Sequence, residues 1–243
     1  MTKAKPPGKE VTNFEEQMAA EAKAVAKTER VSADRFTLQS GILSYMGEPI
    51  PDNQMDCIIV AAFSENVYYS GAYDPDNVTP PDCFALGNSG EDLYPHKDVP
   101  EAINDDCRSC DFMKFKSAPN GKGKACKEKR RLAIIPYSKK AEDLQSGDMA
   151  MMTIPVMSVK NWSVYVNAIS AKHQRPSWGM ITRIKVVPDP KSQFRVTFSE
   201  VDKLPSEHLG AVNSRLEAAQ TMLQTPYEMD PEEKQEEEGD KKY

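Results

Sequence analysis

The sequence predicts a mainly β fold with a few helices (α+β), most like a small Greek-key barrel that carries an inserted loop. Short apolar or alternating runs, separated by Gly, Pro, Asn and Asp, recur from Phe36 onward, as in strands joined by turns. One helical pattern interrupts these runs and another follows them. A segment at 79–130 is rich in Pro, Gly, Asp and Lys and has no sustained apolar periodicity, which predicts the insertion.

Residues 1–35 form the first predicted unit, an N-terminal arm that contains a helix. Asn13 is suited to cap it, Glu16 follows three residues later, and Ala, Glu and Lys dominate as far as Arg30. The apolar surface of this helix is small. We therefore expect the arm to attach loosely to the body.

Residues 36–205 form the predicted barrel. Ser158 begins the expected mid-chain helix, whose apolar side chains recur at spacings that place them on one face. Two strands flank the turn Pro188-Asp189-Pro190 as a predicted hairpin. The expected strands are Phe36–Tyr45, Met55–Phe63, Val67–Tyr73, Arg131–Tyr137, Ala150–Met157, Trp178–Val187 and Phe194–Val201.

The C-terminal part divides into a helix at 206–225 and a tail at 226–243. Leu209, Val212, Leu216, Ala219 and Leu223 recur at helical spacing. The tail has eight acidic and three basic residues and very few apolar ones. Because it cannot bury enough surface to repay its ordering entropy, we predict a disordered acidic tail.

The composition limits the classes of protein to which the chain can belong. The longest apolar run, Ile58–Phe63, is far shorter than the roughly 20 residues that a membrane span needs. Met1–Glu10 lacks the apolar stretch of a signal peptide. We therefore expect a cytoplasmic protein without a membrane partner. In a reducing compartment its five cysteines are expected to be thiols or metal ligands.

Four cysteines in the insertion predict a structural zinc site. Cys107 and Cys110 have the Cys-x2-Cys spacing with which one tight turn presents two thiolates to a tetrahedral metal. Cys126 follows at zinc-ribbon spacing, and Cys83 would complete the set. Four thiolates leave no open position on Zn2+, so the metal would stabilise a segment that lacks a core of its own.

Two alternatives remain open at these cysteines. The four could be free thiols, with a redox-type pair at 107 and 110, although a redox motif usually opens a helix after a strand. His96 could replace Cys83 as a ligand. Cys57, inside an apolar run, is expected to be a small buried side chain.

The formal charge of −6 hides a strongly basic segment. Between Asp111 and Lys140 there are ten basic and two acidic residues. Such a loop can follow a phosphate backbone while nearby rings stack on bases, but a solvated lysine-rich loop is the alternative. The expected phosphate contacts are Lys114, Lys116, Lys122, Lys124, Lys127, Lys129, Arg130 and Arg131, and the stacking candidates are Phe112, Phe115, Tyr68, Tyr69 and Tyr73.

No pattern of catalytic residues emerges from the sequence. It lacks a phosphate-binding Gly-x4-Gly-Lys-Ser/Thr loop, a His-Glu-x2-His pair and a Gly-x-Ser-x-Gly nucleophile motif. The carboxylates ahead of Cys110 are plentiful but unpatterned, so a nuclease is the weakest hypothesis. We expect a binding protein and not an enzyme.

Several motifs stand out when they are taken together. They are Pro81-Asp82-Cys83-Phe84, Asp106-Cys107-Arg108-Ser109-Cys110, Gly121-Lys122-Gly123-Lys124-Ala125-Cys126-Lys127, Arg130-Arg131-Leu132-Ala133, the helix at Trp162–Tyr165 and the acidic tail. With these motifs the chain resembles the zinc-containing single-stranded DNA-binding proteins of tailed bacteriophages, over roughly Phe36–Phe198 and the tail. The resemblance implies an OB-like barrel, a bound Zn2+, sequence-nonspecific binding of single-stranded DNA in replication, recombination or repair, and a tail that engages proteins of those processes.

A protein-interaction module is the alternative function. In that hypothesis the zinc-stapled loop binds a protein of replication or transcription, and the acidic tail mimics DNA. The sequence does not decide the oligomeric state.

Overall fold

The computed structural model describes residues 35–71, 79–90 and 93–227, together with positions 14, 17, 18, 20 and 21. It divides the chain into two compact units, Met1–Ala33 and Asp34–Tyr243. In the first unit the five described positions are helical and exposed, which agrees with the helix predicted there. Residues 228–243 of the predicted acidic tail, and Tyr73, lie outside the described residues.

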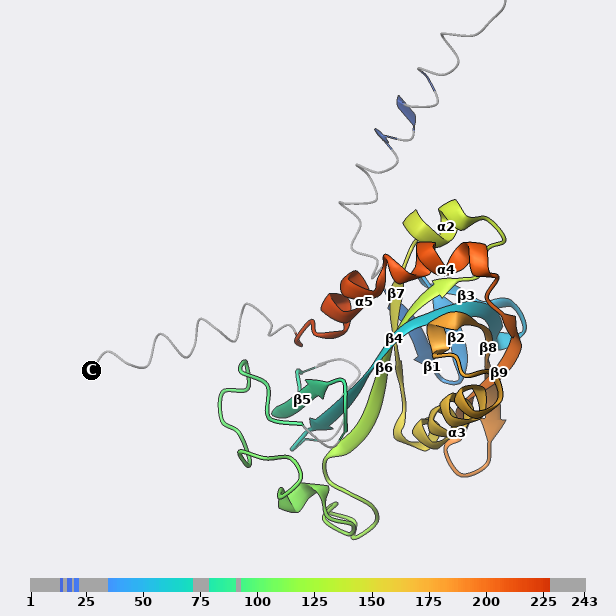
Figure 1. The fold of residues 1–243 in the computed structure, drawn as a ribbon. Helices are drawn as coiled ribbons and strands as arrows, with labels where there is room; N and C mark the ends of the chain where they lie inside the picture. Colours follow the sequence, from blue (N-terminus) through green and yellow to red (C-terminus); the bar gives the residue numbers. More distant parts are fainter. Residues whose placement is uncertain are drawn as a thin grey trace, which may run out of the picture. The chain divides into compact units, whose positions relative to one another are not determined.

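The second unit is a mixed α/β fold dominated by one strongly curled sheet that forms a half-barrel (Figure 1). Its order is β3-β2-β1-β7-β6-β4-β8-β9, and β5 pairs with β4 beside this path. The strands are β1 (Arg35–Gln39), β2 (Ile42–Tyr45), β3 (Glu48–Pro49), β4 (Gln54–Tyr68), β5 (Cys83–Gly87), β6 (Lys127–Pro136), β7 (Ala150–Ile154), β8 (Met180–Asp189) and β9 (Gln193–Lys203).

Strand β4 is the centre of this sheet. It pairs with β8 through its first residues, with β6 along most of its length and with β5 at its end, always antiparallel. The sequence predicted two strands here, Met55–Phe63 and Val67–Tyr73, because Ser64, Glu65 and Asn66 interrupt the apolar run. That prediction was wrong: the polar triplet lies inside one strand, and all three side chains are buried.

Two hairpins close the sides of the sheet. The predicted strand at Phe36–Tyr45 is the hairpin of β1 and β2, which turns at Ser40 and Gly41 with φ of 53° and 79°. The predicted hairpin at the chain's other end is β8 and β9. A Cβ at Gly41 would lie 3.4 Å from that of Phe194, so the two hairpins meet. One pair, β1 with β7, is parallel, whereas all the other strand pairs described in this sheet are antiparallel.

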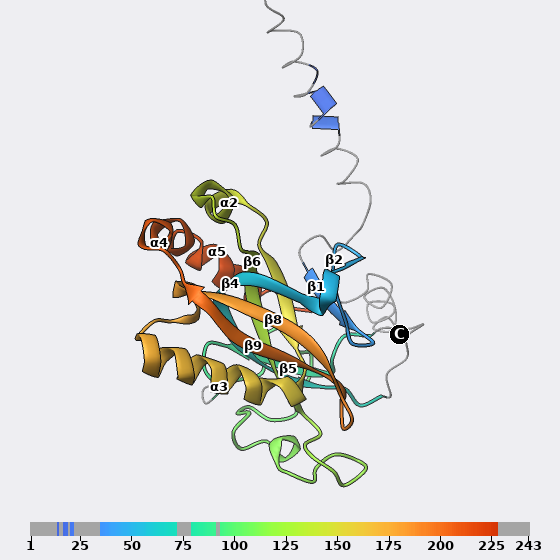
Figure 2. The same cartoon turned by 90° about the vertical axis from the view of Figure 1, so that its right-hand side faces the viewer.

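Helix α3 (Val156–His173) covers the inner side of the curl (Figure 2). Trp162, Tyr165 and Ile169 lie on its buried face, as their spacing predicted. They pack with Leu132, Ile134 and the other inward side chains of the sheet. Ser158 Oγ accepts from the backbone N–H of Val196, and Asn161 Nδ2 donates to its carbonyl, so the helix also satisfies the edge of β9.

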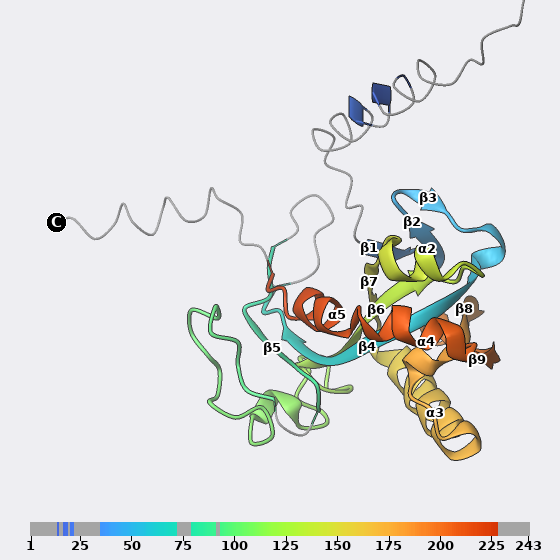
Figure 3. The same cartoon turned by 45° about the horizontal axis from the view of Figure 1, so that its top comes forward.

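A second apolar cluster lies on the outer side of the sheet under α2 (Ala141–Ser146), α4 (Ser206–Asn213) and α5 (Leu216–Leu223). Figure 3 shows α4 and α5 in succession along β4. The sequence predicted one continuous helix here and did not predict α2. The helix breaks at Ser214–Arg215, where the guanidinium of Arg215 donates to the carbonyls of Gln145 and Gly147 next to α2.

The sheet continues as an arm, which consists of residues 63–68 of β4, strand β5 and residues 127–131 of β6. Phe63 still belongs to the second apolar cluster, and the rest of the arm lies beyond both clusters. The cysteine lobe, residues 93–126, projects from this arm (Figure 1). Its only helix is η2 (Asp111–Met113), a single 3-10 turn. The other 3-10 turns are η1 (Pro51–Asn53) and η3 (Ser177–Gly179).

No helix among the described residues is both long and apolar enough to cross a membrane.

Ile169 and Val164 on α3 test which face of the helix stabilises the half-barrel. Ile169 is 1% exposed and Val164 is 61% exposed. We expect Ile169→Ala to lower the free energy of unfolding by about 2–5 kcal/mol, because a buried side chain is lost and a cavity remains. Val164→Ala should change it by less than about 0.5 kcal/mol. Urea unfolding followed by circular dichroism measures both, and equal losses would contradict this packing.

Candidate nucleic-acid interface and cysteine cluster

The fold brings the four predicted zinc ligands together at the arm. Cys83 begins β5 opposite Tyr68, and Cys126 directly precedes β6, whose Lys127 pairs with Val67. These two cysteines therefore flank the end of β4 on either side. Cys107 and Cys110 lie in the lobe on one tight turn, in which the N–H of Cys110 donates to the carbonyl of Cys107.

The electrostatics of the thiols indicate that the four lie within range of one another's charge. Burial raises the pKa of Cys107 to about 11 and that of Cys126 to about 12, and it also raises the pKa of Cys83. Charge on each thiol opposes ionisation of the others, and this holds for every pair among the four. Within the described residues, however, no group of three or more His, Cys, Asp or Glu side chains is arranged closely enough to hold a metal ion.

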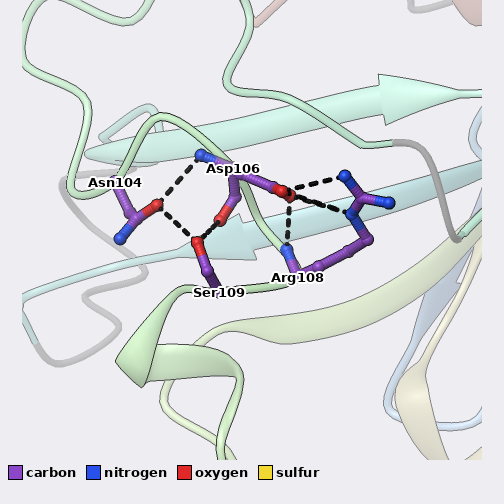
Figure 4. A network of polar contacts seen from close by, with 4 residues as sticks. All are labelled: Asn104, Asp106, Arg108 and Ser109. Carbon is purple, nitrogen blue, oxygen red and sulfur yellow. Dashed lines mark hydrogen bonds and ion pairs between the residues drawn. The ribbon is translucent and has the colours of Figure 1, made fainter.

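The polar segment before Cys107 shapes the cysteine turn. Asp106 accepts from the backbone N–H and the guanidinium of Arg108, while Asn104 Oδ1 accepts from the N–H of Asp106 (Figure 4). Ser109 Oγ lies 3.1 Å from Asn104 Oδ1 and from the carbonyl of Asp106. Hydrogen bonds from Arg108 lower the pKa of Asp106. The bend is therefore held by polar groups and not by an apolar core.

The lobe as a whole has almost no core. Among residues 93–126 the buried apolar side chains are Leu93, Ala118, Ala125 and Cys126. Hydrogen bonds fold the basic loop back on itself: the N–H of Lys116 donates to the carbonyl of Gly123, and the N–H of Cys126 donates to that of Phe112. Gly121 and Gly123 have φ of 68° and 80°, which these turns require.

The predicted phosphate contacts differ in how accessible they are. Lys116, Lys122 and Lys127 are exposed. Lys114 is exposed but pairs with Asp111, and Lys124 pairs with Glu128. Lys129 and Arg130 are half-buried, and burial lowers the pKa of each. The structure therefore presents at its surface only part of the cationic set that the sequence predicted.

Arg131 has to be removed from that set. Its side chain is 2% exposed and lies beside Glu65, which is 0% exposed. Arg131 Nε donates to Glu65 Oε1 at 2.6 Å, and Nη1 donates to the carbonyls of Leu223 and Thr225. The prediction of a phosphate contact failed because β6 begins in the basic run and continues into the core. Along such a strand the side chain of Arg131 is turned inward, although its basic neighbours are at least partly exposed.

The aromatic candidates divide between the two sides of the arm. The ring of Tyr68 packs on that of Phe112, with centroids 4.6 Å apart, so this pair joins the lobe to β4. Phe115 is 73% exposed and Tyr69 is 39% exposed. Lys129 Nζ lies 6.0 Å from the centroid of the Tyr69 ring. Among the candidate rings that the structure describes, Phe115 and Tyr69 are therefore the ones exposed enough to stack on a base.

Sequence reasoning missed three residues on which the arm depends. Glu65 was read as part of a break between strands, and Tyr227 as the beginning of the tail. Tyr227 Oη donates to Glu65 Oε1 at 2.7 Å, and its ring lies 5.0 Å from the Arg131 guanidinium. Asn66 forms a hydrogen bond with the Cys107 thiol. One signal for Glu65 was available in the sequence. It lies two positions from Phe63 and two from Val67, so on a continuous strand it shares their face.

His96, the alternative to Cys83 as a zinc ligand, contacts other groups than the cysteines. Its ring stacks on Phe84 with centroids 4.8 Å apart, and Nδ1 lies 3.6 Å from Asp98 Oδ2.

The fifth cysteine, Cys57, is fully buried, as predicted, and burial raises the pKa of its thiol.

Comparisons with known proteins identify no relative: no family model, no curated protein and no solved structure matches the chain. The functional argument therefore rests on this chain's own residues.

Truncation of Arg131 should reveal the cost of an unpaired charge in the arm. Arg131→Ala leaves the Glu65 carboxylate buried without its cation, and we expect a loss of about 3–5 kcal/mol in the free energy of unfolding. Arg130→Ala, at the half-buried neighbour, should cost less than about 1.5 kcal/mol. Both are measured by urea unfolding.

The double variant Glu65→Leu/Arg131→Leu separates the pair from simple packing. It removes both charges together. Its loss in the free energy of unfolding should therefore fall well below the sum of the losses of Glu65→Leu alone and Arg131→Leu alone. Additive losses would show that the two side chains do not act as a pair.

Proposed function

We propose that the chain binds single-stranded DNA without base specificity, along the arm and the cysteine lobe. The observation that carries this proposal is the exposure of the basic loop. This loop presents Lys116, Lys122 and the ring of Phe115 to solvent and leads to the exposed Lys127 at the start of β6. Phosphates and ring faces are common to every sequence, so cations and rings of this kind bind strands of any composition. The proposed activity needs no catalytic group.

The order of strands supports an OB-like reading of the half-barrel. Apart from β5, which lies between β4 and β6, the strands β4, β6, β7, β8 and β9 follow one another along the chain. Helix α3 lies between β7 and β8, and β4 pairs with both β6 and β8. In OB-folds the connections between strands 1 and 2 and between strands 4 and 5 bind oligonucleotides. The corresponding connections here are the one that contains the cysteine lobe and the turn at Lys191. We propose that the parallel strand β1 completes the barrel beside β7.

Zinc is part of the proposal, with Cys83, Cys107, Cys110 and Cys126 as its ligands. Four neighbouring thiols suit Zn2+, and a lobe with so few buried apolar side chains needs another source of stability. The thiols would have to draw closer to reach ligand distances of about 2.3 Å. The metal would hold the basic loop in place and take no part in a reaction.

Metal analysis tests the zinc site. We expect about one Zn2+ per chain in the purified protein. The double variant Cys107→Ser/Cys110→Ser should retain less than half of that amount, because two of the four ligands are lost. Cys57→Ala is the control, since this thiol lies in the core, and it should keep its zinc. A wild-type chain without zinc, or a double variant with the full amount, would refute the site.

A salt series tests the binding of single-stranded DNA. The logarithm of the affinity should fall linearly with the logarithm of salt concentration, with a slope of roughly 0.7 per phosphate contacted. Lys122→Ala and Lys127→Ala should each reduce that slope by about 0.7. Lys139 is an exposed lysine two residues before α2, a helix that Figure 1 shows well away from the lobe, and Lys139→Ala should leave the slope unchanged.

Fluorescence anisotropy with labelled oligonucleotides measures these slopes. An affinity that does not depend on salt, or equal slopes in all the variants, would sink the proposal. The protein-interaction alternative predicts no binding of the oligonucleotide at low salt.

A further inference from the structure

A cavity of about 390 Å3 lies on the side of the arm where the C-terminal segment crosses it. This volume falls within the roughly 300–1,000 Å3 of sites that bind small molecules. Strand β5 and its end provide Leu86, Gly87 and Asn88, and the loop 96–98 forms a second wall. Phe63 provides apolar surface from β4, and Gln224 and Pro226 complete the boundary. We name this space the C-terminal cavity.

The walls of the C-terminal cavity combine flat apolar groups with polar ones. Phe63, Leu86 and Pro226 are apolar, and His96 stacks on Phe84, against which the ring of Tyr227 packs edge-on at 5.2 Å. Asn88, Lys97 and Gln224 are exposed residues, so the polar groups stand where the cavity meets the surface. Asp98 adds a carboxylate acceptor to the lining.

The C-terminal wall of the cavity is held in place by the buried pair. Arg131 donates to the carbonyls of Leu223 and Thr225, and Tyr227 donates to Glu65, so residues on both sides of Gln224 and Pro226 are fixed to the sheet. A wall that is already ordered binds without a further loss of conformational entropy.

The cations that β6 adds to the proposed DNA path lie on the same face of the arm as the C-terminal cavity. Alternate residues of a strand share a face, so Phe63, Glu65 and Val67 point to one side of β4. Their partners on β6 are Arg131, Lys129 and Lys127. Lys127 is exposed, and Lys129 lies under the exposed ring of Tyr69. A strand bound by these groups passes beside the cavity.

We propose that the C-terminal cavity binds one nucleotide of the bound strand, through its base and its 5′-phosphate. The inference rests on the proposed function. The base lies between the apolar surfaces of Phe63, Leu86 and Pro226, its edge meets Asn88 and Gln224, and Lys97 neutralises the phosphate. Of the ligands that a single strand offers, only a nucleotide has both a flat apolar body and an anionic group.

Filling the cavity tests this inference. Gln224→Trp places an indole in the cavity wall from an exposed position. Gln220→Trp is the matched control, because Gln220 is exposed one turn earlier on α5 and does not line the cavity. Should Gln224→Trp fail to fold by circular dichroism, Asn88→Trp fills the cavity from the opposite wall.

The two oligonucleotides to compare are a thymidine 20-mer and the same strand with abasic residues in place of half its nucleotides. Both have the same number of phosphates, so the electrostatic part of binding is equal. We expect Gln224→Trp to bind the intact strand about tenfold more weakly than wild type, since stacking of one base contributes about 1–3 kcal/mol. Its affinity for the abasic strand should fall much less, and Gln220→Trp should match wild type on both. A variant that weakens both strands equally, or neither, overturns the inference.

Thymidine 5′-monophosphate tests the cavity independently of strand binding. In wild type it should shift the backbone amide signals of Asn88 and Lys97 in NMR spectra, and Gln224→Trp should abolish these shifts. Equal shifts in both proteins, shifts in neither, or the same shifts with inorganic phosphate alone overturn the nucleobase assignment. If wild type binds neither oligonucleotide, the proposed function fails, while shifts specific to the mononucleotide still support the cavity as a nucleotide site.

Discussion

The buried ion pair of Glu65 and Arg131 joins three parts of the molecule that are distant in sequence. Glu65 belongs to β4, Arg131 to β6, and their remaining hydrogen bonds go to the C-terminal segment at Leu223, Thr225 and Tyr227. Two charges that are removed from water need partners for each other and for their other polar atoms. Glu65 Oε2 has no hydrogen-bond partner in the structure, so the pair is only partly satisfied. The arm and the C-terminal segment therefore depend on each other's position.

The two faces of the arm carry different structures because side chains alternate along a strand. On one face, Asn66 bonds to the Cys107 thiol and the ring of Tyr68 packs on Phe112, so the cysteine lobe is attached there. On the other face, Phe63 lines the C-terminal cavity and Glu65 lies in the ion pair. Neither face has a large apolar cluster, and polar interactions, with the proposed metal, take the place of a core.

The structure shows where the basic residues of the sequence lie and how far each is exposed. The basic run at 114–131 is not a uniform flexible loop: its first part is folded by hydrogen bonds, its middle is exposed and its end enters the sheet. Lys127 is exposed, Lys129 is half-buried and Arg131 is buried, although all three point to the same face of β6. Burial increases toward the centre of the sheet, where the C-terminal segment covers the strand.

The sequence by itself determined the elements whose signals are local. Most strands of the half-barrel, the buried face of α3 and the burial of Cys57 follow from apolar periodicity, although β5 gave no such signal. The cysteine spacing predicted a four-thiol site, which stays a prediction. Only the tertiary structure decided that Ser64–Asn66 continue β4, that Arg131 turns inward and that Tyr227 belongs to the body. These features depend on pairings between residues as much as 162 positions apart. Periodicity within a short window contains no information about such partners, because a polar residue in a strand becomes a core residue only when a complementary group meets it.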